Sequence, residues 1–86
     1  MFYERTDSAI EFARKRVEAG RATKEDRLLL LLSDGEWHLG SEMTEEVSWR
    51  FGAYLFNLKE SGVAWEKERV PVKGATVYKY RLSRVE

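Results

Sequence analysis

The side chains best suited to chemistry in this sequence are cations near its C-terminal end. Residues 65–86 hold six basic and three acidic side chains, although the whole chain is neutral with 15 of each. The basic residues of this stretch are Lys67, Arg69, Lys73, Lys79, Arg81 and Arg84. Clustered cations attract phosphates, so a binding face can sit on this stretch although the chain is neutral, and these side chains would supply the electrostatic part of any binding to double-stranded DNA.

Residues 48–57 hold a second candidate set with mixed chemistry. Arg50 and Asn57 carry the kinds of side chain that read base edges in DNA. The same stretch has an apolar stripe, formed by Trp49, Ala53 and Phe56. Exposed aromatic patches are more typical of protein contacts. Two interpretations therefore remain open: a helix that reads DNA, and an apolar face that packs on the N-terminal helix, on a second subunit or on a protein partner.

The sequence offers little metal or catalytic chemistry. His38 is the only histidine and cysteine is absent, so we expect no transition-metal site. We interpret His38 as a strand residue on the solvent side of Trp37, with no partner for a catalytic triad. The acidic residues Glu42, Glu45 and Glu46 fit the first turn of a helix, where carboxylates stabilise the positive end. We expect no enzyme activity, no metal and no cofactor.

The first element that must position these residues is a helix over residues 8–19. Ser8 and Glu11 form a capping-box pattern, and Gly20 is a natural stop. One face of this helix is apolar and carries Ile10, Ala13 and Val17. That face needs burial, either within its own domain or across a two-fold axis. We favour the second, a homodimer through the N-terminal helix.

A second helix is predicted over residues 24–33, with Thr23 as its N-cap. Its apolar run Leu28–Leu32 indicates a central buried helix. This is the longest apolar run in the chain and is far shorter than the roughly 20 residues of a membrane span. The absence of cysteine favours a reducing compartment. We therefore expect a cytoplasmic protein without a membrane partner.

The middle of the chain predicts a short strand and a helical region. Residues 36–39 alternate polar and apolar side chains, which is typical of a strand. Residues 41–61 form either one helix or a short helix, a turn and a longer helix over 49–61. We favour the break because Ser48 can cap a fresh start. Gly62 then ends the longer helix.

The last third changes to the period of β-strands. Strands are predicted over 64–68 and 76–82, joined by a loose basic loop over 69–75. The apolar face of this hairpin carries Tyr78, Tyr80 and Leu82, and the other face carries Lys79 and Arg81. The predicted core of the domain consists of Leu29, Leu32, Val47, Phe51, Leu55, Leu58, Trp65, Tyr80 and Leu82.

This order of elements resembles the winged helix-turn-helix superfamily, and it is similar to small helix-turn-helix proteins of phages and bacteria. The resemblance is carried by DGEWHLGSEM at 34–43, FGAYLFNLKESGV at 51–63 and VYKYRL at 77–82. It implies an α+β fold with a three-helix core and a C-terminal β-hairpin wing over residues 23–86. Residues 1–22 would be an extra N-terminal helix.

The resemblance also implies a function. In this superfamily the recognition helix enters the major groove, and the wing touches the backbone or the minor groove. By position, the DNA-facing residues would be Ser48, Trp49, Arg50, Gly52, Ala53 and Asn57 on the helix, with Lys67, Arg69 and Lys73 on the wing. We expect a small transcriptional regulator or a phage-type DNA-associated protein. The alternative is an adaptor, antirepressor or assembly subunit that uses the Trp49/Ala53/Phe56 face.

Overall fold

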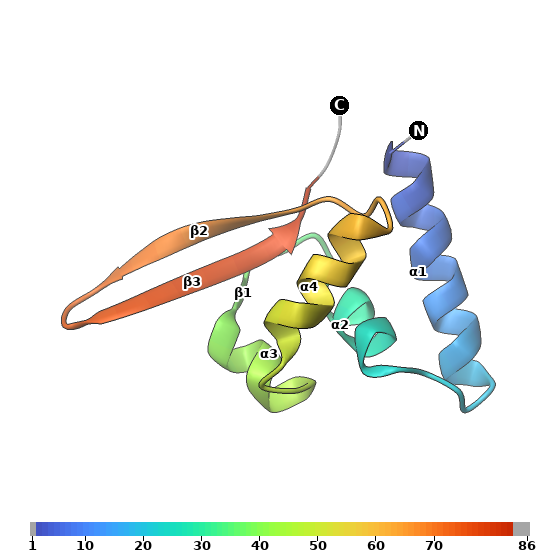
Figure 1. The fold of residues 1–86 in the computed structure, drawn as a ribbon, viewed down its shortest axis with the longest axis horizontal. Helices are drawn as coiled ribbons and strands as arrows, with labels where there is room; N and C mark the ends of the chain where they lie inside the picture. Colours follow the sequence, from blue (N-terminus) through green and yellow to red (C-terminus); the bar gives the residue numbers. More distant parts are fainter. Residues whose placement is uncertain (1, 84–86) are drawn as a thin grey trace.

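The computed structural model describes the backbone of residues 2–83 and the side chains of residues 6–83, which form an α+β fold. In chain order the elements are α1 (Phe2–Glu18), α2 (Lys24–Leu32), β1 (His38–Leu39), α3 (Gly40–Glu46), α4 (Phe51–Glu60), β2 (Trp65–Val72) and β3 (Ala75–Leu82). The four helices gather at one end, and the β2–β3 hairpin projects away from them (Figure 1). The hairpin tip and α1 therefore lie at opposite ends of the molecule.

The three strands form one antiparallel sheet in the order β1–β3–β2. Strands β2 and β3 pair from Trp65 opposite Leu82 to Val72 opposite Ala75, and Gly74 (φ 78°) turns the chain between them. The predicted loop over residues 69–75 is therefore wrong, because most of it is paired strand. Pro71 misled the prediction. It is tolerated within β2 because β2 is an edge strand with only one paired side.

Helix α1 packs along α2 within the same chain. Ala13 is fully buried and Ile10 is packed against the core, whereas Val17 is 46% exposed. The apolar face of α1 is thus largely covered by its own domain, so α1 does not need a second subunit to bury it. The helix also begins at Phe2 and not near Ser8. The buried Thr6 shows that the turn before Ser8 packs on the domain as well.

A two-pronged ion pair fixes α1 to the start of α2. Arg16 donates from Nε and Nη2 to the two carboxylate oxygens of Asp26, at 2.7 and 2.6 Å. Asp26 is also the third residue of a capping box, in which it accepts from the Thr23 N–H while the Thr23 hydroxyl accepts from the Asp26 N–H. The hydrogen bonds from Arg16 hold the pKa of Asp26 below its usual range.

The predicted break between α3 and α4 is confirmed. Helix α3 ends at Glu46 and α4 begins at Phe51. The predicted cap is wrong, because the N-cap residue of α4 is Arg50, without a side-chain cap hydrogen bond, and the Ser48 hydroxyl instead accepts from the Arg50 N–H at 3.1 Å in the turn before the helix. The acidic cluster is divided by this geometry. Glu42 lies in the first turn of α3, but Glu45 and Glu46 lie in its last turn. The prediction that all three carboxylates sit at the positive end of a helix is wrong, because α3 is only seven residues long.

The core lies where α1, α2, α3, α4 and the base of the hairpin meet. Six of the predicted residues are buried, namely Leu29, Leu32, Val47, Leu55, Leu58 and Leu82. The three predicted aromatic residues, Phe51, Trp65 and Tyr80, are half-buried and pack against that core. The buried residues missed by the prediction are Ala13, Leu28, Met43 and Val63. Within residues 2–83, no helix is long and apolar enough to cross a bilayer.

Candidate functional site

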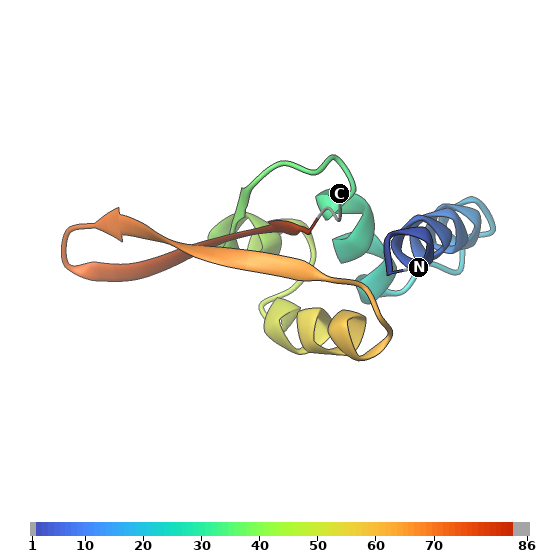
Figure 2. The same ribbon diagram turned by 90° about the horizontal axis from the view of Figure 1, so that it is seen from above.

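Helix α4 has one side in the core and one side in solvent. Leu55 and Leu58 are buried, as the helical spacing predicts. The other side carries Phe56, which is 60% exposed, and Trp49 in the preceding turn, which is 78% exposed. Both aromatic side chains stay mostly exposed, so burial of this stripe against α1 within the same chain is not supported. In Figure 2, α4 lies on one side of the hairpin base.

Small exposed residues separate the two aromatic side chains. Gly52 and Ala53 are both exposed, and no atom lies within 4 Å of where a Cβ on Gly52 would stand. We refer to Trp49, Gly52, Ala53 and Phe56 as the α4 stripe. Arg50 flanks the stripe, with its guanidinium 5.9 Å from the centre of the Trp49 ring.

Asn57 is not free to read a base. Its side-chain amide donates to a carboxylate oxygen of Glu25 in α2, at 2.8 Å. This contact ties α4 to α2 and places an anion beside the amide. A phosphate or an acceptor on a base would have to displace Glu25. The prediction of a base-reading role for Asn57 is therefore not supported by its surroundings.

The hairpin has two faces, because directly opposite residues in antiparallel strands point to the same side. Lys67 pairs with Tyr80, and Arg69 pairs with Tyr78. Tyr80 meets Phe51 of α4 edge to face, with ring centres 5.6 Å apart. On the same face, the Trp65 indole N–H donates to the backbone oxygen of Leu55 in α4, at 2.7 Å. We call this the α4-side face.

The opposite face carries Lys79 and Arg81, as the alternation predicted. Lys79 lies 3.2 Å from a carboxylate oxygen of Glu68, and Arg81 lies 3.4 Å from one of Glu66. Both cations also cover the ring of Trp37, at 4.8 and 4.3 Å from its centre. Trp37 belongs to the segment before β1, which lies on the side of the hairpin base away from α4 (Figure 2). These two cations are neutralised and point away from α4.

The remaining cations have no carboxylate partner among the residues that the structure describes. Lys67 lies over the ring of Tyr78, with its ammonium 4.7 Å from the ring centre. Arg69 and Lys73 line an open hollow at the hairpin tip together with Pro71 and Val72. Arg50 is exposed beside the α4 stripe. Arg84, also predicted to contribute, lies outside the described residues.

A groove separates the hairpin from the starts of α3 and α4. It is lined by Gly40, Ser41, Phe51, Thr76, Val77, Tyr78 and Tyr80. A Cβ on Gly40 would stand 3.2 Å from the Phe51 ring and 3.6 Å from the Tyr80 ring. Gly40 thus allows α3 to start against these two rings, which closes the bottom of the groove.

His38 is buried, so its predicted place on the solvent side of Trp37 is wrong. Its Nδ1 lies 2.7 Å from a Glu42 carboxylate oxygen, and its Nε2 lies 3.0 Å from one of Asp34. Both partners were missed, although each stands four residues from His38 in the sequence. The two carboxylates bind opposite edges of the ring. The three side chains therefore do not converge on one point, as metal ligands must.

The two carboxylates set the charge of His38. Burial alone would lower the pKa of the imidazole, but the hydrogen bonds and charges of Asp34 and Glu42 outweigh it and raise the pKa above its usual value. The pKa of Asp34 is held low: burial opposes this, but the Glu36 N–H and His38 outweigh it. Only a doubly protonated ring can donate to both carboxylates. This ion triad joins the end of α2, β1 and α3.

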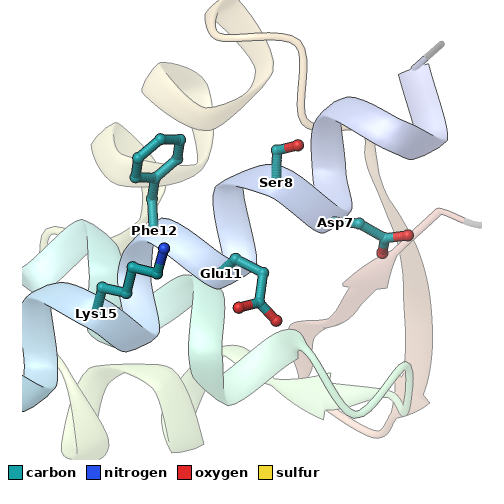
Figure 3. A pocket seen from close by; sticks show the side chains of 5 residues that line it. All are labelled: Asp7, Ser8, Glu11, Phe12 and Lys15. Atoms are coloured by element: carbon teal, nitrogen blue, oxygen red, sulfur yellow. The ribbon is translucent and has the colours of Figure 1, made fainter.

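A further hollow lies on the outer side of α1 and is lined by Asp7, Ser8, Glu11, Phe12 and Lys15. Figure 3 shows that these side chains come from one helix and point in different directions. Phe12 extends to one side, while the carboxylate of Glu11 extends to the other. Because their polar groups do not converge, this hollow has no arrangement that would orient a ligand.

Comparison with protein-family models, with curated proteins and with solved structures gives no match for this chain.

Proposed function

We propose that this protein is a winged helix protein that binds double-stranded DNA with α4 and the α4-side face of the hairpin. The proposal rests on one observation: the cations of the hairpin lie on two faces, and they differ in whether a carboxylate neutralises them. Lys79 and Arg81 are paired with glutamates on the face away from α4. Lys67 and Arg69 lack such partners in the described chain and share a face with α4. A phosphate backbone that ran beside α4 would meet cations that no carboxylate neutralises.

The shape of the molecule fits this arrangement. The outer side of α4 is exposed, and its small residues Gly52 and Ala53 allow a groove floor to approach closely. Ala53 suits contact with a thymine methyl, and Arg50 is the side chain best suited to read a guanine. The hairpin strands have eight residues each and extend roughly 26 Å, so Arg69 and Lys73 reach phosphates beyond the helix.

The number of free cations limits the expected affinity. Arg50, Lys67, Arg69 and Lys73 give at most about four phosphate contacts, so the log–log slope of affinity against salt is expected near −4. Such a slope means modest binding at physiological salt. A single domain with this few contacts suits a regulator that binds DNA in more than one copy or together with another protein.

The experiment compares two double variants that change the net charge equally. Lys67→Gln/Arg69→Gln neutralises the α4-side face, and Lys79→Gln/Arg81→Gln neutralises the opposite face. We expect the first variant to flatten the salt slope by about 2 and to weaken binding to all duplexes alike. The second should change the slope by much less, because its cations are already paired. Fluorescence anisotropy with a labelled random duplex over a salt series measures both.

These variants distinguish binding through one face of the hairpin from binding through net charge alone. Equal effects of the two double variants would show that only net charge matters and would overturn the assignment of a face. Arg50→Ala should cost about 1–3 kcal/mol on a preferred site and much less on random duplex. If the wild-type protein binds no duplex even at low salt, DNA binding through this surface is rejected.

A second candidate function is binding of a protein through the α4 stripe. The observation that favours it is the exposure of Trp49 (78%), in the turn before α4, and of Phe56 (60%), within α4. Paired exposed aromatics at this spacing are typical of interaction sites. An adaptor or assembly subunit of this kind would show no salt-dependent retention on duplex DNA, and Trp49→Ala would abolish its partner binding without changing its fold.

A further inference from the structure

The α4 stripe is symmetric about its own centre. Trp49 and Phe56 lie at its ends, and Gly52 and Ala53 lie between them, one on each side of the midpoint. Glycine is a poor helix former, and neither a positive φ nor a close neighbour in the chain requires it at position 52. A glycine that its own fold does not need, on an exposed helix face, points to the close approach of another molecule.

We propose that two copies of this chain pair through their α4 stripes, with the two helices antiparallel. A two-fold axis midway between positions 52 and 53 places Trp49 of one copy against Phe56 of the second copy. The same axis places Gly52 of one copy against Ala53 of the second, so that the helix backbones approach closely at the centre. Each bulky end then fills the space beside the small centre. This is an isologous contact, in which one surface complements itself.

Charge supports the same pairing. Arg50 is the N-cap residue directly before α4, and Asn57 lies two helical turns further along, so we place both on one flank of the stripe. In an antiparallel pair related by a two-fold axis, equal flanks meet, and Arg50 of one copy comes beside Asn57 of the second. Asn57 holds the carboxylate of Glu25 at 2.8 Å. The guanidinium of each copy thus approaches a carboxylate of the other, twice by symmetry, whereas neither Arg50 nor Glu25 has an ion-pair partner in the described part of its own chain.

The size of the contact predicts a weak, reversible dimer. The exposed parts of the four aromatic side chains amount to on the order of 500 Å², since an aromatic side chain has about 150–250 Å² and these are 78% and 60% exposed. Stable interfaces bury about 1,200–2,000 Å². Self-association is therefore expected in the micromolar range or weaker, with monomers in dilute solution.

Pairing of this kind has a regulatory consequence that rests on the proposed function. The dimer covers Arg50, at the start of α4, and Gly52 and Ala53 within it, which are the residues assigned to DNA. A second copy and a duplex would then compete for one surface. Without DNA, the protein would form dimers in which the α4 stripe is covered. Added duplex would bind monomers and shift the equilibrium away from the dimer.

Sedimentation velocity of the wild-type protein from low to high micromolar concentration tests the pairing without DNA. We expect a shift from monomer to dimer, and an increase of at least about tenfold in the dissociation constant for Trp49→Ala and for Phe56→Ala. Phe12→Ala is the matched control, because Phe12 is also 60% exposed but lies on α1, outside the stripe. Equal effects of all three variants, or a monomer at every concentration, would overturn the proposal.

Two further variants test the geometry of the pairing. Gly52→Ala leaves the fold intact because the added methyl meets nothing in its own chain, but it separates the helices and should weaken the dimer. Reversal of one charge, Arg50→Glu or Glu25→Arg, should also weaken it. The double charge reversal should restore most of the lost association. If the double reversal is weaker than either single reversal, the antiparallel register is wrong.

Addition of an unlabelled duplex to the dimer distinguishes failure of the pairing from failure of DNA binding. The expected result is a fall in dimer and the appearance of monomer–duplex complexes. A dimer that binds the duplex intact overturns the competition but leaves the pairing in place. A dimer that ignores the duplex overturns the proposed DNA function alone, because the self-association is measured without DNA.

Discussion

The joint between α1 and α2 and the outer side of α4 use similar residue types with opposite results. At the joint, an alanine is fully buried and an arginine is held by both oxygens of a buried aspartate. At the start and on the outer side of α4, an arginine and an alanine are both exposed and the arginine has no carboxylate partner within the described residues. The side chains of the joint therefore have their partners within the chain, whereas those of the α4 stripe are exposed to solvent.

This difference indicates where each substitution should be felt. A side chain whose contacts are all within the chain contributes to folding, so its loss lowers the free energy of unfolding. A side chain that contacts only solvent contributes little to folding, so its loss should be visible only when a partner is present. Matched substitutions at the joint and on α4 should therefore separate effects on folding from effects on binding.

Adjacent residues on α4 should differ most. Leu55 is 2% exposed and Phe56 is 60% exposed. Leu55→Ala should lower the free energy of unfolding by about 2–5 kcal/mol, the range for truncating a buried leucine. Phe56→Ala should change it by less than about 0.5 kcal/mol. Urea denaturation followed by tryptophan fluorescence measures both changes. Similar values for the two variants would show that the buried and exposed sides of α4 do not differ in their contribution to folding.

Asp26→Ala should have the next largest effect, about 2 kcal/mol, because it removes two charged hydrogen bonds and one side of a capping box. Hydrogen exchange should show α1 exchanging faster than α4. The matched control is Glu11→Ala, which removes only an exposed 3.6 Å pair with Arg14 and should change stability little. If α1 stays as protected as in the wild type, the ion pair does not hold the joint together.

The smallest expected effect is on the pH dependence of the free energy of unfolding, and it comes from the ion triad of His38 with its two carboxylates. The pKa of His38 is raised from 6.5, so the folded protein binds this proton more tightly than the unfolded chain. The stabilisation is complete below about pH 6.5 and is lost as the pH rises through the folded-state pKa. We expect the free energy of unfolding to fall on that rise in the wild type but not in His38→Gln.

Acid should act in the opposite direction through the carboxylates. The pKa values of Asp26 and Asp34 are both lowered from 3.8 in the folded protein. Their contribution is present above that value and is lost as the pH falls through the folded-state values. Urea denaturation of wild type and His38→Gln at closely spaced pH values measures both the loss of stability at high pH and the loss at low pH. Parallel curves for wild type and His38→Gln above about pH 6 would show that the imidazole is not held as the cation.

The fold was predictable wherever a period ran long enough. The leucine run of α2, the spacing of Leu55 and Leu58 in α4, and the alternation through Tyr80 in β3 each fixed an element within a few residues. The ends of elements were less predictable. Helix α1 begins at Phe2, earlier than its capping pattern indicates. The turn before Ser8 includes the buried Thr6, and burial depends on tertiary packing that a local pattern does not show.

The candidate site was predictable in composition but not in partners. The sequence showed which residues are basic, and its alternation placed Lys79 and Arg81 on one face. It did not show that Glu66 and Glu68 pair with them, because the register of the hairpin depends on its length, and Pro71 concealed that length. The contact between Asn57 and Glu25 spans 32 positions and leaves no local pattern. The partners of His38 did leave a pattern, at four residues on either side, which a search for carboxylates would have found.

Pro71 in the outer strand has a consequence for the behaviour of the protein at high concentration. An uncovered strand edge is a template on which further chains add, and natural proteins interrupt such edges with proline and charge. Strand β2 has both, since Lys67, Glu68 and Arg69 precede its proline. The hairpin can therefore extend into solvent without recruiting its neighbours into fibrils. Ordered, saturable association in a concentrated solution then has to come from side chains, and open-ended growth would be the sign that this protection had been lost.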